Sequence, residues 1–107
     1  MKALLVFCNV PDRAQAERIA EALVAGQWAA CVNILAPCRS VYRWQEAVTS
    51  ADEVPLLIKT TEAAYPYLEQ QLRELHPYQV PEIIACDIAA GLPDYLTWVG
   101  ESVFSRA

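Results

Sequence analysis

The hydrophobic and polar positions of the chain first predict a strand and then a helix. The stretch ALLVFCNV, residues 3–10, is almost continuously apolar and is bounded by Pro11. A short run of this kind is typical of a central strand that is covered on both faces. Asp12 and Gln15 then have the spacing of a capping box, and Gly26 can serve as a C-terminal cap. Between them the apolar residues have the spacing of an amphipathic helix: Ala16, Ile19, Ala20, Leu23 and Val24.

Three extended segments follow this helix. ACVNIL, residues 30–35, and SVYRW, residues 40–44, are interrupted by Pro37, and VPLLIKTT, residues 54–61, comes after a polar stretch. Such runs predict strands, and the polar stretch can turn the chain back. We therefore expect a long hairpin, with Pro55 at the start of its strand or on an edge because proline cannot donate a ladder hydrogen bond.

A second helix is indicated by apolar residues that follow one another at intervals of four, four and three positions. Thr61 is a plausible cap for it, and Pro66 is tolerable because it lies near the first turn. Pro77 stops the helix near His76, because the residue before a proline is disfavoured in helical conformation. The apolar positions of this helix are Ala64, Leu68, Leu72 and Leu75.

The remaining elements complete an α+β plan. EIIACDI, residues 82–88, predicts a fourth strand when residues 30–44 are counted as one interrupted strand, and Gly91 and Pro93 open a last helix with Tyr95, Leu96, Val99 and Val103 on one face. The order is the ferredoxin-like βαββαβ arrangement plus a terminal helix, in which two helices cover one face of an antiparallel sheet. We expect a single domain over residues 1–107. Its open sheet face and the unpaired edges of the long hairpin predict an oligomer.

Composition and charge exclude several classes of partner. Hydrophobic residues make up 55% of the chain and charged residues 20%, which is typical of a globular protein. A net charge of −5 with scattered basic residues argues against nucleic acid, and the N-terminal apolar run is too short for a signal or a membrane span. We expect a cytosolic protein with four reduced cysteines: Cys8, Cys31, Cys38 and Cys86.

Sequence signatures of catalysis are weak. The three glycines form no phosphate-binding loop, and the motifs G-x-S-x-G and H-E-x-x-H are missing. Cys8 and His76 could form a thiolate dyad, but nucleophilic catalysis also needs an oxyanion site that the sequence does not identify. We therefore expect neither an enzyme nor an organic cofactor.

Six motifs, in this order and spacing, resemble the CutA divalent-cation-tolerance family. They are FCNVPD, AACVNIL, SVYRW, EVPLLIKTT, HPYQVPEI and DYLTWV, and together they span nearly the whole chain. The resemblance implies a cytosolic homotrimer of ferredoxin-like subunits, similar in plan to the PII signalling proteins, with strands of neighbouring subunits joined into shared sheets. It also implies a link to copper and other divalent metals.

The resemblance also implies a metal site at the first-strand cysteine and at two adjacent histidines before Pro-Tyr. Cys8 matches the cysteine, but the histidine pair is represented by Leu75 and His76. One thiolate and one imidazole are an incomplete set for copper or zinc, which take three or four protein ligands. Two hypotheses remain: weak binding of a divalent metal, copper before zinc, or a structural role for both residues.

Six further side chains keep the types expected from the family and are candidates for an intersubunit cleft: Tyr42, Trp44, Glu53, Lys59, Tyr78 and Glu82. Lys59 would either anchor an anionic ligand or be the solvated member of a half-buried ion pair. Pro77 and Pro81 stiffen the segment that would place Tyr78 and Glu82 opposite Lys59 and a neighbour's Trp44. Where the family turns with a glycine and a basic residue after the tryptophan, this chain has WQEA.

The residues therefore leave three functional hypotheses. The first is a metal-responsive trimer, and the second is a PII-like sensor of a small anionic effector in the intersubunit cleft. The third is a structural trimer that acts through protein partners, which the sequence does not identify.

Overall fold

The computed structural model describes residues 1–104, and the predicted α+β order is confirmed in it. The strands are β1 Ala3–Val10, β2 Cys31–Ile34, β3 Cys38–Trp44, β4 Ala47–Thr61 and β5 Ile83–Asp87. The helices are α1 Arg13–Ala25, α2 Tyr65–Leu75 and α3 Pro93–Ser102. The third predicted strand begins earlier than expected, at Ala47, because its first half is exposed and pairs with β3 rather than with the core.

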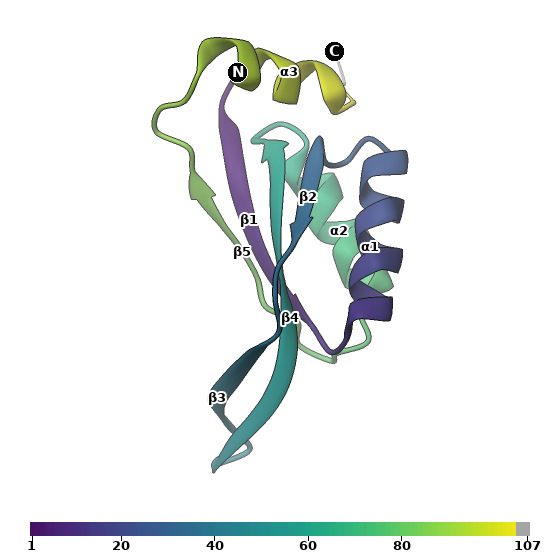
Figure 1. Cartoon of the computed structure of the whole chain (residues 1–107), viewed down its shortest axis with the longest axis vertical. Helices are drawn as coiled ribbons and strands as arrows, with labels where there is room; N and C mark the ends of the chain where they lie inside the picture. The colour runs from purple at the N-terminus through teal and green to yellow at the C-terminus, as the bar shows by residue number, and fades with distance from the viewer. Residues whose placement is uncertain (105–107) are drawn as a thin grey trace.

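The strands form an antiparallel sheet with the order β2-β4-β1-β5. β1 is central, and its Cys8 lies opposite Leu56 of β4 and Ile83 of β5. β3 pairs only with the first half of β4, and Figure 1 shows this hairpin projecting beyond the sheet. The chain is therefore elongated, with extents of 44 × 26 × 23 Å.

The core lies between the sheet and the two helices α1 and α2, which cover the same face (Figure 1). Alternate residues of β1 and β4 point toward the helices, because successive side chains of a strand point to opposite faces. These residues pack against the apolar faces of both helices and are almost fully buried: Val6, Cys8, Val10, Leu56 and Ile58 from the strands, with Ile19, Leu23, Leu68 and Leu72 from the helices.

Both ends of α1 lie where the sequence predicted them, but the reason for glycine at the C-terminal end differs from the one expected. Asp12 accepts a hydrogen bond from the backbone N–H of Gln15 at 2.8 Å, as a capping residue does. Gly26 is the C-cap, but its φ of −80° is right-handed, and the positive φ belongs to Gln27. A Cβ at Gly26 would lie 2.0 Å from the Trp28 ring, so close packing requires glycine there.

The helix α2 begins and ends close to its predicted bounds. Thr61 accepts a hydrogen bond from the backbone N–H of Ala64 through its hydroxyl oxygen at 3.2 Å, although Ala64 is the N-cap. His76 is the C-cap in extended conformation, as the following proline predicts. Arg18 of α1 donates a hydrogen bond to the carbonyl oxygen of Leu75 at 2.8 Å and so satisfies an end carbonyl of α2.

The helix α3 lies across one end of the sheet (Figure 1). Val99 and Val103 pack there with Ala30 and Ala64 in a second apolar cluster. The predicted apolar face of this helix is only partly correct, because Tyr95 is 40% exposed. No helix within residues 1–104 is long and apolar enough to cross a membrane.

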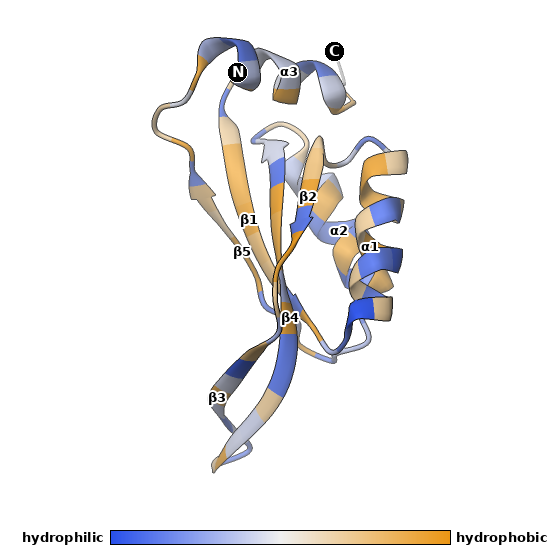
Figure 2. Ribbon diagram, viewed as in Figure 1, coloured by the Kyte–Doolittle hydropathy of each residue, from blue (hydrophilic) through white to orange (hydrophobic). Residues whose placement is uncertain are grey.

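The second face of the sheet is open, as predicted. Leu5, Phe7, Leu57 and Ile84 point away from α1 and α2, because they alternate with the core residues of their strands. The first three are half-buried and Ile84 is 55% exposed. Figure 2 shows that the central strands are largely hydrophobic along this part of the sheet.

Candidate ligand-binding cleft

A cavity of about 670 Å³ lies between the β3–β4 hairpin and the segment that joins α2 to β5. This volume falls within the range of small-molecule sites. The residues that line it are Asn9, Ser40, Val41, Tyr42, Trp44, Glu53, Pro77, Tyr78, Gln79, Val80 and Glu82.

The hairpin supplies one wall through its strand alternation. Tyr42 pairs with Thr49 and Trp44 with Ala47, so both aromatic side chains lie on the same face of the ribbon as Glu53. Tyr42 and Trp44 are each 42% exposed, which leaves ring surface available to a ligand. This wall therefore combines two aromatic rings with a carboxylate.

The turn of this hairpin uses two residues, Gln45 and Glu46, with φ values of 49° and 68°. Positive φ at both central positions is typical of the tight turn that best matches the twist of paired strands. The altered sequence WQEA thus still forms a tight turn, but with two non-glycine residues in the left-handed region. That region costs a residue with a Cβ about 1 kcal/mol or more.

His76 fixes the opposite wall. Its Nδ1 accepts a hydrogen bond from the backbone N–H of Tyr78 at 3.1 Å, so its Nε2 carries the proton and donates to the carbonyl oxygen of Asn9 at 2.7 Å. The rings of His76 and Tyr78 lie 4.7 Å apart between centroids. His76 is 7% exposed, and it ties the segment after α2 to the end of β1.

Two carboxylates converge on Asn9. The Nδ2 atom of Asn9 lies 3.5 Å from Oε1 of Glu53 and 3.5 Å from Oε1 of Glu82. Glu53 is only 8% exposed and also accepts a hydrogen bond from the Tyr78 hydroxyl, whereas Glu82 is exposed. Burial, followed by this hydrogen bond and the charge of Glu53, raises the pKa of Tyr78 to about 12.

The cleft is electrostatically negative. Burial and then the charges of Glu82 and Glu53 raise the pKa of the Cys8 thiol to about 12. In the part of the chain that the structure describes, no lysine or arginine lines the cavity. An arrangement of two carboxylates without a basic neighbour favours a cation over an anion.

Cys8 and His76, predicted as metal ligands, do not form a ready ligand pair. Cys8 is 1% exposed and points to the helices, and its raised pKa keeps it as the thiol rather than the thiolate that metals require. Both ring nitrogens of His76 are already hydrogen-bonded. Over residues 1–104, no three His, Cys, Asp or Glu side chains are placed to hold a metal ion. The donor atoms of a single chain do not fit a copper or zinc site. Metal binding by Cys8 and His76 therefore stays a prediction.

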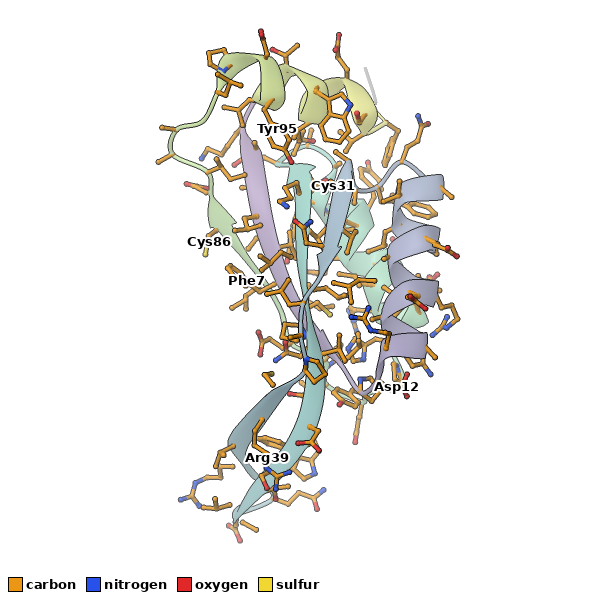
Figure 3. The ribbon with its side chains drawn as sticks, viewed as in Figure 1. Phe7, Asp12, Cys31, Arg39, Cys86 and Tyr95 are labelled. Atoms are coloured by element: carbon orange, nitrogen blue, oxygen red, sulfur yellow. The ribbon has the colours of Figure 1, made fainter. Side chains whose placement is uncertain are left out.

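Five of the six predicted cleft residues come together in one chain, and Lys59 does not. Lys59 lies on the open face of the sheet, where it donates a hydrogen bond to Oδ1 of Asn33 and approaches Sγ of Cys31 at 4.0 Å. It is six residues from Glu53 along β4, which corresponds to about 20 Å. Tyr95 of α3 also points to Cys31 (Figure 3), so this cluster is a separate place on the molecule.

Sequence reasoning missed Asn9, although it connects both walls. A polar residue near the end of an otherwise apolar strand was the available signal. Gln79 and Val80 were also missed, because they lie within a segment whose direction depends on the His76 hydrogen bonds.

Comparisons with known proteins agree on one family. The profile described as "CutA1 divalent ion tolerance protein" matches residues 4–102. A protein of Thermus thermophilus named divalent-cation tolerance protein CutA is 47% identical over 98 residues, which cover 92% of this chain and 95% of that protein. The crystal structure of CutA1 from Oryza sativa superposes with a TM-score of 0.96 at 34% identity, covering 99% and 97% of the two chains. A structure named periplasmic divalent cation tolerance protein CutA, from Archaeoglobus fulgidus, has a TM-score of 0.92 at 31% identity, with coverages of 95% and 99%.

Proposed function

The chain belongs to the CutA1 divalent ion tolerance protein family, and on this premise we propose that it acts as a homotrimer in the response to divalent metal ions, without catalysis of its own. The family match over residues 4–102 and the names of the relatives support the link to divalent cations.

The open face of the sheet is the observation that carries the proposed assembly. Leu5, Phe7, Leu57 and Ile84 form an apolar surface opposite α1 and α2. Burying such a surface stabilises an assembly by roughly 25 cal/mol per Å² of apolar area. The projecting hairpin adds unpaired strand edges, which neighbouring chains commonly cover. A closed ring of three subunits would satisfy both features and place the cleft residues near a subunit boundary.

The geometry gives less support to the other functional hypotheses. Cys8 and His76 do not provide a complete ligand set for copper or zinc within residues 1–104 of one chain. An anionic effector would need a basic group in the cleft, and Lys59 of the same chain lies elsewhere. A trimer that acts only through protein partners would bind no small molecule in the cleft.

A reducing compartment such as the cytosol fits the cysteine content. The four cysteines are free, and Cys86 is exposed on β5. Exposed free thiols persist where disulfides do not form readily, which is the basis for this assignment.

The assembly and the metal response can be tested with the same variant. We expect light scattering on a sizing column to give three times 11.9 kDa at micromolar concentration, and Phe7→Asp to lower this mass because it charges the open face. In a bacterial host that lacks its own CutA1 protein, the chain should restore growth in excess copper, and Phe7→Asp should not. A folded monomer in the unaltered chain would contradict the assembly, and failure to restore growth in copper, zinc and cobalt would contradict the role in metal response.

A further inference from the structure

We propose that the cavity between the β3–β4 hairpin and residues 77–82 binds a small organic cation, an ammonium or guanidinium group carried on an apolar body. The inference goes beyond the proposed role in metal response and does not require it. It rests on the charge, burial and aromatic lining of the cavity.

Glu53 is a buried carboxylate without an opposite charge beside it in the described part of the chain. Glu53 is 8% exposed, and its hydrogen-bond partners, Tyr78 and Asn9, are both neutral donors. Burial of a charge is costly unless an opposite charge compensates it. The ion pairs between side chains of residues 1–104 are formed by Lys2 and Arg39, and neither includes Glu53. A cationic ligand would supply the missing opposite charge.

The two arginines of the hairpin, Arg39 and Arg43, are directed elsewhere. Arg43 lies 3.5 Å from the carbonyl oxygen of Glu46, to which it donates. Arg39 pairs with Asp52 at 3.0 Å and donates to Ser50 at 2.8 Å. By strand alternation this pair lies on the opposite face of the ribbon from Tyr42. The cavity therefore keeps its negative charge in the folded chain.

The aromatic lining favours an organic cation. Tyr42, Trp44 and Tyr78 surround the same cavity as Glu53 and Glu82. Aromatic faces attract cations within about 6 Å of the ring centre, most strongly when water is excluded. The rings also supply apolar area for the body of the ligand. A combination of aromatic faces and carboxylates is the usual arrangement for binding alkylammonium and guanidinium groups.

A bare metal ion is a poorer match to this cavity. Its volume of about 670 Å³ is that of a small-molecule site. Glu53 and Glu82 are the two carboxylates that converge on Asn9, and within the described chain no third His, Cys, Asp or Glu joins them. Hard divalent cations take six or more oxygen ligands and would find few here.

The cavity wall is also held in place before a ligand arrives. His76 bonds both Asn9 and Tyr78, and Pro77 restricts the backbone between His76 and Tyr78. A wall that is already ordered loses little entropy on binding, which strengthens the binding of a small ligand.

Three soluble probes of similar size test the proposal: benzyltrimethylammonium, benzyl alcohol and benzoate. We expect calorimetry to show binding of the ammonium probe with a Kd of about 1 mM or tighter, with the indole N–H signal of Trp44 shifting in NMR spectra. The neutral and anionic probes should bind at least tenfold more weakly, because only the cation gains from the carboxylates. Equal or tighter binding of benzoate would overturn the proposal.

Charge-removing variants make the test specific. Glu53→Gln and Glu82→Gln should each weaken binding of the ammonium probe by about threefold to tenfold. Trp44→Leu should weaken it by about the same factor. Glu82 is exposed, so its variant remains informative even if Glu53→Gln disturbs folding. Glu101→Gln removes the same charge from α3, at the far end of the molecule (Figure 1), and should bind as the unaltered chain does.

Three results would overturn the cation site without contradicting the proposed function. A trimer that supports growth in copper but does not bind the ammonium probe would overturn the cation site and leave the metal response standing. The same holds if a basic side chain of a neighbouring subunit occupies the cavity. Unchanged affinity in both glutamate variants would also overturn it.

Discussion

Single residues of this protein change their chemistry because of where the sheet places them. Cys8 is a protonated thiol in the core, since it points to the helices and lies near the negative cleft. His76 acts as a fixed bridge between two backbone groups, which leaves neither ring nitrogen free. At this scale, burial and hydrogen bonding decide what a residue can do more strongly than its type does.

The raised pKa of Cys8 predicts a loss of stability in alkaline solution. The unfolded thiol ionises near its ordinary value of 9.0, whereas the folded thiol holds its proton to about 12. The unfolded state therefore binds fewer protons above pH 9, and stability falls as the pH rises through this window. We expect the free energy of unfolding in urea to fall by about 1.4 kcal/mol between pH 8 and pH 10 from this residue.

Cys8→Ala tests the assignment through the pH dependence and not through absolute stability. In this variant the free energy of unfolding should no longer show the decrease between pH 8 and pH 10 that Cys8 causes. Cys86→Ala, at an exposed cysteine, should still show it. If the two variants show the same dependence on pH, Cys8 is not the group responsible.

Secondary-structure elements show how locally unfavourable conformations are tolerated. The hairpin turn holds Gln45 and Glu46 at positive φ, a conformation that glycine adopts without steric cost. The turn persists because the two strands on either side pair along seven residue positions, from Cys38 opposite Glu53 to Trp44 opposite Ala47. Strand pairing thus overrides the preference of the turn residues.

Relief of this strain should stabilise the hairpin. We expect Glu46→Gly to raise the free energy of unfolding by about 1 kcal/mol, because glycine adopts positive φ without the Cβ clash. Ala47→Gly, next to the turn in an ordinary strand conformation, should lower stability by roughly 0.5–1 kcal/mol. Urea denaturation of both variants, with Glu46→Gln as the control for charge, checks the prediction. Equal effects of the two glycine substitutions would contradict it.

The whole molecule is organised by the difference between the two faces of its sheet. One face is closed by α1 and α2, and the other presents apolar residues of β1, β4 and β5. Figure 3 shows Phe7 and Cys86 on the side of the sheet away from these helices. Assembly through this second face would change which residues meet solvent.

The reactivity of Cys86 reports on that assembly. Its side chain is exposed in one chain and lies on the open face opposite Leu5. We expect iodoacetamide to modify Cys86 at least tenfold more slowly in the assembled protein than in Phe7→Asp, because a neighbouring subunit would cover the thiol. Mass spectrometry of the modified peptides gives both rates. Equal rates would show that the open face is not the interface.

Much of the fold could be predicted because its signals are local. The apolar run of β1, the Asp12 cap and the proline after His76 each act through neighbouring residues, and each was confirmed in the structure. The start of β4 could not be predicted, since most of its first half is exposed and depends on pairing with β3. Gly26 was predicted in the correct place, but its reason lies in the packing of Trp28.

The order of elements, the open sheet face and the residue types of the cleft follow from local patterns, because periodicity and proline positions act over a few residues. Which of those residues meet depends on the packing of segments that are distant in the chain. Strand register brings Asn9, Glu53 and Glu82 together and leaves Lys59 on the open face, about 20 Å further along β4. The sign of the charge in the cleft therefore follows from long-range pairing, which no local pattern encodes.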